Sequence, residues 1–203
     1  SSSYDFALAD NGARVLPALT SSTVGLGPPS FLSGLIAVAR GFDKSHIHIN
    51  PPRVVIEEHV SATSCWKFAG SQGHIAIQMS TPIHWNGVTM HFPEHEIVGE
   101  KLGQSPRAFA LWALVSKGVE GLGVENVFAD WEEFVIEKRL LESSIFNSTV
   151  TFIRVAEFTY EFWKGTRQRF DIPLPLQTAV VLVQILENRG DPFTCVYRIA
   201  FHG

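Results

Sequence analysis

The sequence lacks the features that mark a membrane-spanning, nucleic-acid-binding or disordered chain. Its apolar runs, such as residues 35–39, are far too short to cross a bilayer. No block of lysine or arginine occurs, and the net charge over 203 residues is −4, so nucleic acid and anionic membranes are poor candidate partners. The sequence starts with three serines and contains no signal peptide, so we expect it to be a domain excised from a longer protein.

Most catalytic signatures are also missing. The sequence has no G-x-S-x-G elbow, no phosphate-binding glycine loop and no C-x-x-C pair. The adjacent glutamates at 57–58 and 132–133 cannot form an acid–base dyad, because neighbouring side chains point in different directions. Residues 91–95 fit the H-x-x-E-H pattern of one zinc-peptidase class. Pro93 would break the helix which that chemistry needs, so we expect no enzyme; a metal-dependent hydrolase using His91, Glu94 and His95 is the alternative.

What the sequence does contain is a series of short alternating apolar segments, enough for a sizeable core. From residue 130 the apolar spacing becomes helical, and Asp130 with Glu133 has the spacing of a capping box. The pattern predicts one domain, residues 1–203, folded as an all-β antiparallel β-sandwich with a helical insertion at 116–148. The predicted strands are 15–16, 54–56, 65–68, 74–79, 83–92, 108–114, 150–156, 158–162, 179–186 and 193–202.

Residues 20–50 form an arm whose structure the pattern leaves open. Its beginning is rich in Ser, Gly and Pro, which predicts a loop. Residues 31–40 fit a helix capped by Ser30 and closed by Gly41, or two short strands. Either way an apolar patch is exposed unless the core or a partner covers it. The residues of this patch include Phe31, Leu32, Leu35 and Ile36.

Only two cysteines occur, Cys65 and Cys195, and both lie in strand-like segments. Their surroundings suit buried thiols and a core disulfide equally. Asn147 begins a glycosylation sequon, which adds slight support for an oxidising compartment. A bond between the two cysteines would close a loop of about 130 residues and stabilise the fold by roughly 4–5 kcal/mol in the chain-entropy model.

Several sequence blocks combine into a pattern that resembles a SUN domain, of the C-terminal type found in nuclear-envelope proteins of fungi and animals. The Cys-Trp block and the Thr-Cys-x-Tyr-Arg block are the most specific, and the match runs in order along nearly the whole chain. The arm at 20–50 and the insertion at 116–148 depart from it. The matching blocks are residues 52–56, 65–73, 105–109, 190–198 and 202–203.

The resemblance implies a jelly-roll-like sandwich in the perinuclear lumen, anchored to the inner nuclear membrane by a coiled coil and a membrane segment outside this sequence. It implies binding of the C-terminal tail of KASH proteins, so that the LINC complex bridges cytoskeleton and nucleoplasm, with the full-length protein a homotrimer. The arm would be the KASH lid, adding a strand to the peptide. Its residues Phe31, Leu32, Leu35 and Ile36 would be covered by the peptide or the next protomer. A SUN-like lumenal module for a different protein or a glycan is the alternative.

The resemblance also assigns site residues. It pairs Cys65 with Cys195. It places a monovalent cation, potassium, on the backbone carbonyls of Val54, Glu57, His59, Ser64 and Tyr197. A pocket for the peptide's terminal carboxylate would be made by Gln104 or Ser105, Phe193 and Tyr197. Phe193 stands where the family has a tyrosine, and Thr20 stands where some members carry a cysteine, so we expect non-covalent binding; simple packing is the alternative role for Tyr197.

Overall fold

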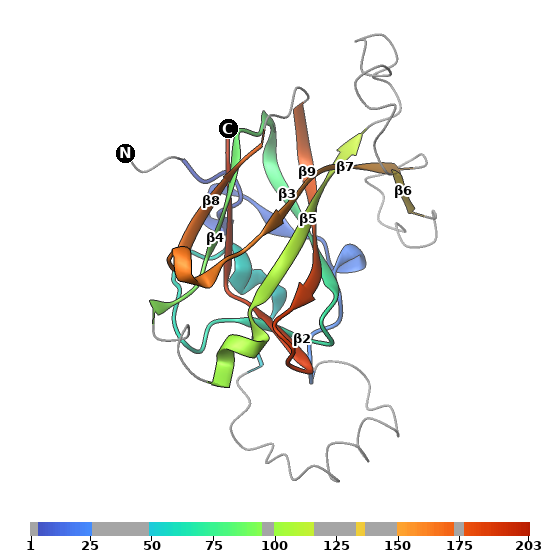
Figure 1. Cartoon of the computed structure of the whole chain (residues 1–203). Helices are drawn as coiled ribbons and strands as arrows, with labels where there is room; N and C mark the ends of the chain where they lie inside the picture. Colours follow the sequence, from blue (N-terminus) through green and yellow to red (C-terminus); the bar gives the residue numbers. More distant parts are fainter. Residues whose placement is uncertain (1–3, 26–48, 95–99, 116–132, 137–149, 173–176) are drawn as a thin grey trace.

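The computed structural model describes residues 4–25, 49–94, 100–115, 133–136, 150–172 and 177–203 (Figure 1). In these residues the regular structure consists of β-strands and short 3-10 helices, with no α-helix. The strands form an antiparallel, jelly-roll-like β-sandwich, so the predicted fold class is confirmed.

The larger sheet joins strands that are far apart in the sequence. Every pair of neighbouring strands in this sheet is antiparallel. Near the middle of the sheet, β5 pairs with β7 on one side and β9 on the other. In order across the sheet, the strands are β1 (Arg14–Val15), β3 (Gly73–His84), β9 (Gln177–Asn188), β5 (Pro106–Val115), β7 (Val150–Thr159) and β6 (Glu133–Ile136).

The remaining strands form a smaller sheet and a two-stranded ribbon. Figure 1 shows β8 and β4 side by side, with β5, β7 and β9 on the other side of the molecule. The smaller sheet has the order β11 (Arg198–His202), β4 (Gly87–His91) and β8 (Arg167–Asp171). The ribbon pairs β10 (Phe193–Val196) with β2 (Trp66–Ala69).

The core lies between the two sheets and follows from alternation along the strands. In β2, Trp66 and Phe68 are buried, while Lys67 between them is half-buried and Ala69 is exposed. Residues two apart share a face of the sheet, so each alternating apolar set points inward. Burying each such side chain stabilises the fold by about 1.5–3 kcal/mol. The same buried cluster includes Ile75, Ile77, Phe109, Leu111, Val181, Val183, Ile199 and Phe201.

The segment predicted as a strand at 54–56 is a 3-10 helix, η4 (Pro52–Ile56), so that prediction was wrong. Pro51 and Pro52 begin the turn, where a proline's fixed φ suits the first helical positions. The N–H of Glu57 then closes it on the carbonyl of Val54. The β-branched side chains of the segment are buried, so they do serve the core, but without a partner strand.

The helical spacing predicted from residue 130 was also wrong where the structure describes it. Residues 133–136 form β6, which pairs with β7 from Glu133 opposite Ile153 to Ile136 opposite Val150. Pairing with a neighbouring strand outweighed the local helical pattern, as tertiary context commonly does. The rest of the insertion at 116–148 lies outside the described residues.

Other strand boundaries differ from the expected ones. Residues 150–156 and 158–162 are not two strands: β7 runs unbroken to Thr159, and a turn, η8 (Phe162–Lys164), follows it. The segment 193–202 is divided at Tyr197, with β10 before it and β11 after it in different sheets. β8 was missed because its sequence, Arg-Gln-Arg-Phe-Asp, has one apolar residue and no alternation.

A largely buried ion pair ties the first described residues to the last strand. Asp5 and Arg198 form a salt bridge at 2.5 Å, with side chains 11% and 13% exposed. The other oxygen of Asp5 accepts the N–H groups of Ala7 and Phe201 at 2.9 and 3.0 Å. Removing either partner would leave the other charge buried without its counterion, which is costly.

We therefore expect Asp5→Ala to lower the free energy of unfolding by about 3–5 kcal/mol, the range for breaking a buried pair. Urea unfolding followed by tryptophan fluorescence measures this change. The matched control is Glu187→Ala, which removes the exposed salt bridge to Arg107 and should cost no more than about 1 kcal/mol. Equal losses in the two variants would show that Asp5 and Arg198 are not a structural pair.

Candidate functional site

A disulfide between Cys65 and Cys195 joins the residue before β2 to β10, with Cα atoms 5.5 Å apart. Both cysteines of the sequence are used, so the chain has no free thiol. The closed loop spans 130 residues, which stabilises the fold by about 5 kcal/mol in the chain-entropy model. The pairing predicted from the family resemblance is confirmed.

The polar loop before Cys65, residues 57–64, is held by side chains from outside it. Asn50 donates its amide to two backbone carbonyls near the end of the loop, at 2.5 and 3.0 Å. Ser61 and Ser64 close a tight turn through their backbone and hydroxyl groups. From the last strand, Arg198 donates to the carbonyl of Glu57 at 2.5 Å. The loop is therefore shaped by bonds to its backbone.

These bonds bear on the carbonyl set predicted to hold potassium. The carbonyl of Val54 accepts the N–H of Glu57, and that of Glu57 accepts the guanidinium described above. Within the described part of the chain, no donor reaches the carbonyls of His59 and Ser64. Carbonyl oxygens suit hard cations, and each has two lone pairs. Because the carbonyl of Glu57 already faces a cationic guanidinium, potassium at this set stays a prediction. The predicted set is Val54, Glu57, His59, Ser64 and Tyr197.

The predicted lid residues Phe31, Leu32, Leu35 and Ile36 lie outside the described residues, but the beginning of the arm is placed. Thr23 forms an antiparallel bridge with Phe68, and the N–H of Val24 donates to the carbonyl of Lys67 at 2.9 Å. Trp66 donates its indole N–H to the Thr23 hydroxyl at 3.0 Å. The arm therefore starts along the edge of β2 that faces away from β10.

Three residues of the predicted carboxylate pocket lie in one region. Gln104 ends the 3-10 helix η6 (Glu100–Gln104), which packs against β10, the strand that begins with Phe193. The carbonyl of Gly103 accepts two N–H groups from the turn just before β10. The hydroxyl of Ser105 is already used, because this 4% exposed residue donates to the carbonyl of Leu102 at 2.9 Å.

The fourth residue, Tyr197, is buried at the junction of β10 and β11. It is 3% exposed and belongs to the main core cluster. Its ring packs on that of Phe92, with centroids 5.1 Å apart. The ring therefore has the packing role weighed as an alternative from the sequence, and its place in a carboxylate pocket stays a prediction.

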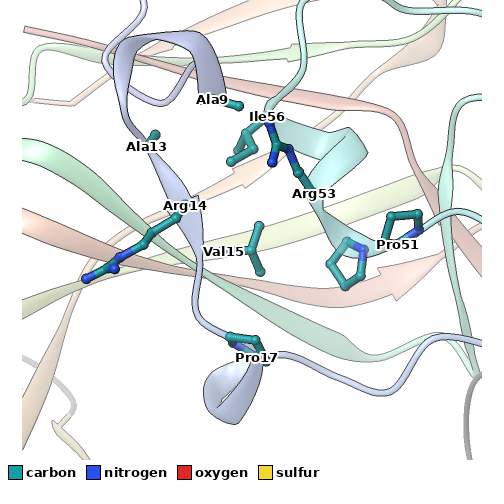
Figure 2. Close-up of a pocket in the computed structure, with 9 residues that line it drawn as sticks. Ala9, Ala13, Arg14, Val15, Pro17, Pro51, Arg53 and Ile56 are labelled. Atoms are coloured by element: carbon teal, nitrogen blue, oxygen red, sulfur yellow. The ribbon is translucent and has the colours of Figure 1, made fainter. Parts of the chain in front are cut away.

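An open hollow of about 410 Å³ lies elsewhere, between the first described residues and η4 (Figure 2). Its walls are mostly small apolar and proline side chains, with Val15 near the centre of the view and Pro51 to one side. Arg53 is paired with Glu57 at 3.3 Å, and Figure 2 shows Arg14 pointing away from the hollow. None of the predicted carboxylate-pocket or cation-loop residues lines it.

Two of the three candidate zinc ligands in the pattern at 91–95 lie among the described residues. His91 ends β4, Glu94 follows in a turn after Pro93, and His95 lies outside the described residues. Among the described residues, no three His, Cys, Asp or Glu side chains come together as metal ligands.

His91 instead lies in a row of cationic residues across the smaller sheet. It is opposite Arg198 in β11 and opposite Arg167 in β8. Burial lowers the pKa of His91, the two guanidinium groups lower it further, and Glu94 opposes them. Burial also lowers the pKa of His74.

These directions predict that the fold loses stability as the pH falls below about 6.5, the usual histidine pKa. Below this pH the unfolded chain binds more protons than the folded chain, so the free energy of unfolding decreases as the pH decreases. His91→Gln should make this fall shallower, leaving the share due to His74. Urea unfolding between pH 5 and 8 measures both slopes; Arg167→Gln, which removes one repelling charge, should flatten the slope partly. Identical slopes in wild type and His91→Gln would contradict the prediction.

Three residues with a place in the site were missed from the sequence. Thr23 and Asn50 looked like ordinary loop residues at the two ends of the arm. Arg189 looked like part of a turn, yet its side chain lies over the rings of Phe162 and Trp163, at 4.9 and 5.8 Å. An aromatic pair in a short polar turn was the only local signal.

Comparison with known proteins supports the sequence resemblance. A family model described as Sad1 / UNC-like C-terminal matches residues 45–127. SUN domain-containing protein 3 of Mus musculus is 28% identical over 98% of this chain and 52% of its own length. SUN domain-containing protein 1 of Homo sapiens is 28% identical over 98% of this chain and 21% of its own length. The chain thus spans about half or less of these relatives. No helix in the described residues is long and apolar enough to span a membrane.

Solved structures agree on the fold. A family 32 carbohydrate-binding module of Streptococcus pneumoniae EndoD is similar with a TM-score of 0.54 at 11% identity, covering 98% of this chain and 99% of that one. An allantoicase has the same TM-score and identity, covering 98% of this chain and 43% of that one. These likenesses concern the sandwich alone. The family match over residues 45–127 and the near full-length alignments show what the chain is similar to: the Sad1 / UNC-like C-terminal domain of SUN domain-containing proteins.

Proposed function

We propose that this chain is a SUN domain, a binding module of the nuclear-envelope lumen that takes the C-terminal tail of a KASH protein. In the full-length protein it would be held at the inner nuclear membrane and act as a homotrimer, forming the lumenal part of a bridge between cytoskeleton and nucleoplasm. The observation that carries the proposal is the position of the arm, which leaves the body along β2 beside the disulfide.

Peptide addition to the arm fits this position. The bridge between Thr23 and Phe68 extends the β10–β2 ribbon by the start of the arm. A tail pairing with the continuing arm would add a further strand, with backbone hydrogen bonds giving affinity and side-chain pockets giving selectivity. The lid residues proposed to cover the tail are Phe31, Leu32, Leu35 and Ile36.

Recognition of the tail's terminal carboxylate gives the sharpest test of the proposal, because Phe193 lacks the hydroxyl that the family's tyrosine supplies. We expect Phe193→Tyr to strengthen binding of a fluorescent KASH C-terminal peptide by about tenfold, the value of one hydrogen bond to a charged group. Tyr197→Phe removes only a hydroxyl from the buried ring and should weaken binding without unfolding the core. Fluorescence anisotropy measures both affinities.

A peptide extended by one residue at its C-terminus serves as the control and should bind poorly to every variant. If the extended peptide binds as well as the natural one, the carboxylate pocket is misplaced. If no KASH tail binds while another lumenal protein or a glycan saturates, the partner itself is wrong.

Potassium is proposed for the loop at 57–64, on the carbonyls of Val54, Glu57, His59, Ser64 and Tyr197. An ion that binds only the folded chain raises the unfolding temperature as its concentration rises. We expect the midpoint to increase when choline chloride is replaced by potassium chloride at constant ionic strength, and less with lithium chloride. A midpoint that is the same in all three salts would exclude the ion site.

A further inference from the structure

The turn between β7 and β8 presents an aromatic pair to solvent. Trp163 in η8 is 64% exposed, more than the other large apolar side chains of the described residues. The ring of Phe162 packs edge-on against it, with centroids 5.2 Å apart. Exposed tryptophan beside a second ring is a common feature of binding surfaces, where amphipathic rings supply contact area at low entropic cost.

Arg189 lies over both rings and is only partly hydrogen-bonded. Its guanidinium carbon is 4.9 Å from the ring centre of Phe162 and 5.8 Å from that of Trp163. One terminal nitrogen donates to the carbonyl of Tyr160. Its Nε is buried and has no partner in the described part of the chain. A guanidinium has five N–H donors, and a buried donor without an acceptor calls for an explanation.

Arg189 forms no salt bridge with a described carboxylate, although the charges of Glu187 and Glu161 act on it. Arg107 is paired with Glu187 at 3.3 Å, and Lys164 is paired with Glu161. Burial and the charge of Arg107 lower the pKa of Arg189, while Tyr160, Glu187 and Glu161 raise it. The planar guanidinium above the aromatic pair still offers a fork of donors that matches an incoming carboxylate.

The backbone of Arg189 is attached to the region of the expected carboxylate pocket. Its N–H donates to the carbonyl of Gly103 at 3.1 Å, next to Gln104. The residues expected there offer few donors, because Phe193 has no hydroxyl and the hydroxyl of Ser105 is used internally. A charged donor nearby would replace what the pocket has lost.

We propose that Arg189, stacked on Phe162 and Trp163, forms a subsite for a carboxylate carried on an apolar residue, and that the C-terminal end of the bound tail occupies it. The guanidinium takes the carboxylate through the terminal N–H groups that the carbonyl of Tyr160 does not use, and the two rings contact the apolar side chain of the same residue. The identity of the occupant rests on the proposed function; the subsite itself can be tested without it.

The first experiment uses N-acetyl-L-phenylalanine and its amide as probes of the folded chain. Titration with the acid should shift the Arg189 Nε–H and Trp163 indole signals in ¹H–¹⁵N spectra in a saturable way, and the amide should not. Arg189→Gln should abolish the Trp163 shift, while Arg14→Gln, which removes an arginine bound to Gln78, should preserve it. An equal response to the amide, a response that persists in Arg189→Gln, or a response of Trp163 to galactose instead of the acid would overturn the proposal.

The second experiment compares a KASH tail ending in a free acid with the same tail ending in an amide. Wild type should prefer the acid by about tenfold or more, and Arg189→Gln should bind both at the level of the amide. Arg189→Lys should show an intermediate preference for the acid, because lysine keeps the positive charge but lacks the planar guanidinium that can donate two hydrogen bonds to one carboxylate. If Arg189→Gln binds the tail as tightly as wild type does, the C-terminal end of the tail does not occupy the subsite. Failure of every tail beside an intact response to the small acid overturns the proposed function and leaves the subsite standing.

Discussion

The disulfide between Cys65 and Cys195 is the constraint that the candidate site depends on. It fixes the residue before β2 to β10, and β2 is the strand along which the arm leaves the body. The loop at 57–64 ends just before the bond, and Asn50, at the far end of the arm, donates to the carbonyl of Cys65 itself. One covalent link therefore positions the arm, the loop and the last part of the chain together.

The segment 193–202 is important to the fold because it is divided at Tyr197. Before it, β10 belongs to the disulfide-linked ribbon; after it, β11 joins the smaller sheet. Arg198, the first residue of β11, reaches both Asp5 and the carbonyl of Glu57. A strand that stayed in one sheet could not bring the first residues and the loop to the same point. The interruption that sequence patterns missed is thus what assembles this side of the domain.

The sequence predicted what depends on local alternation and missed what depends on distant partners. β3, β5 and β9 were predicted from their apolar residues, which are buried in clusters on both faces of the sheet, whereas β8 has a polar edge sequence and was not. The β-branched run of η4 suggested a strand, but a proline pair begins a 3-10 helix there. The helical spacing around Glu133 suggested a helix, but the segment pairs with β7 as a strand. The residues alone left the cysteines unresolved, and the family resemblance paired them. Arg189 and Phe162 are 27 positions apart in numbering, so no local pattern could place one over the other.

Backbone and side-chain ligands have different consequences for a binding site in this fold. Carbonyls of the loop at 57–64 accept hydrogen bonds from Asn50 and Arg198. The proposed ion site would use backbone atoms of this loop, so it should tolerate substitutions of Glu58 or His59. A carboxylate pocket depends on individual donors, and Phe193 has removed one of them. A terminal carboxylate left without donors would lose the hydrogen bonds that water gave it. A pocket of this composition therefore needs a replacement donor or a different ligand, and Arg189 is the cation whose backbone the fold already attaches to Gly103.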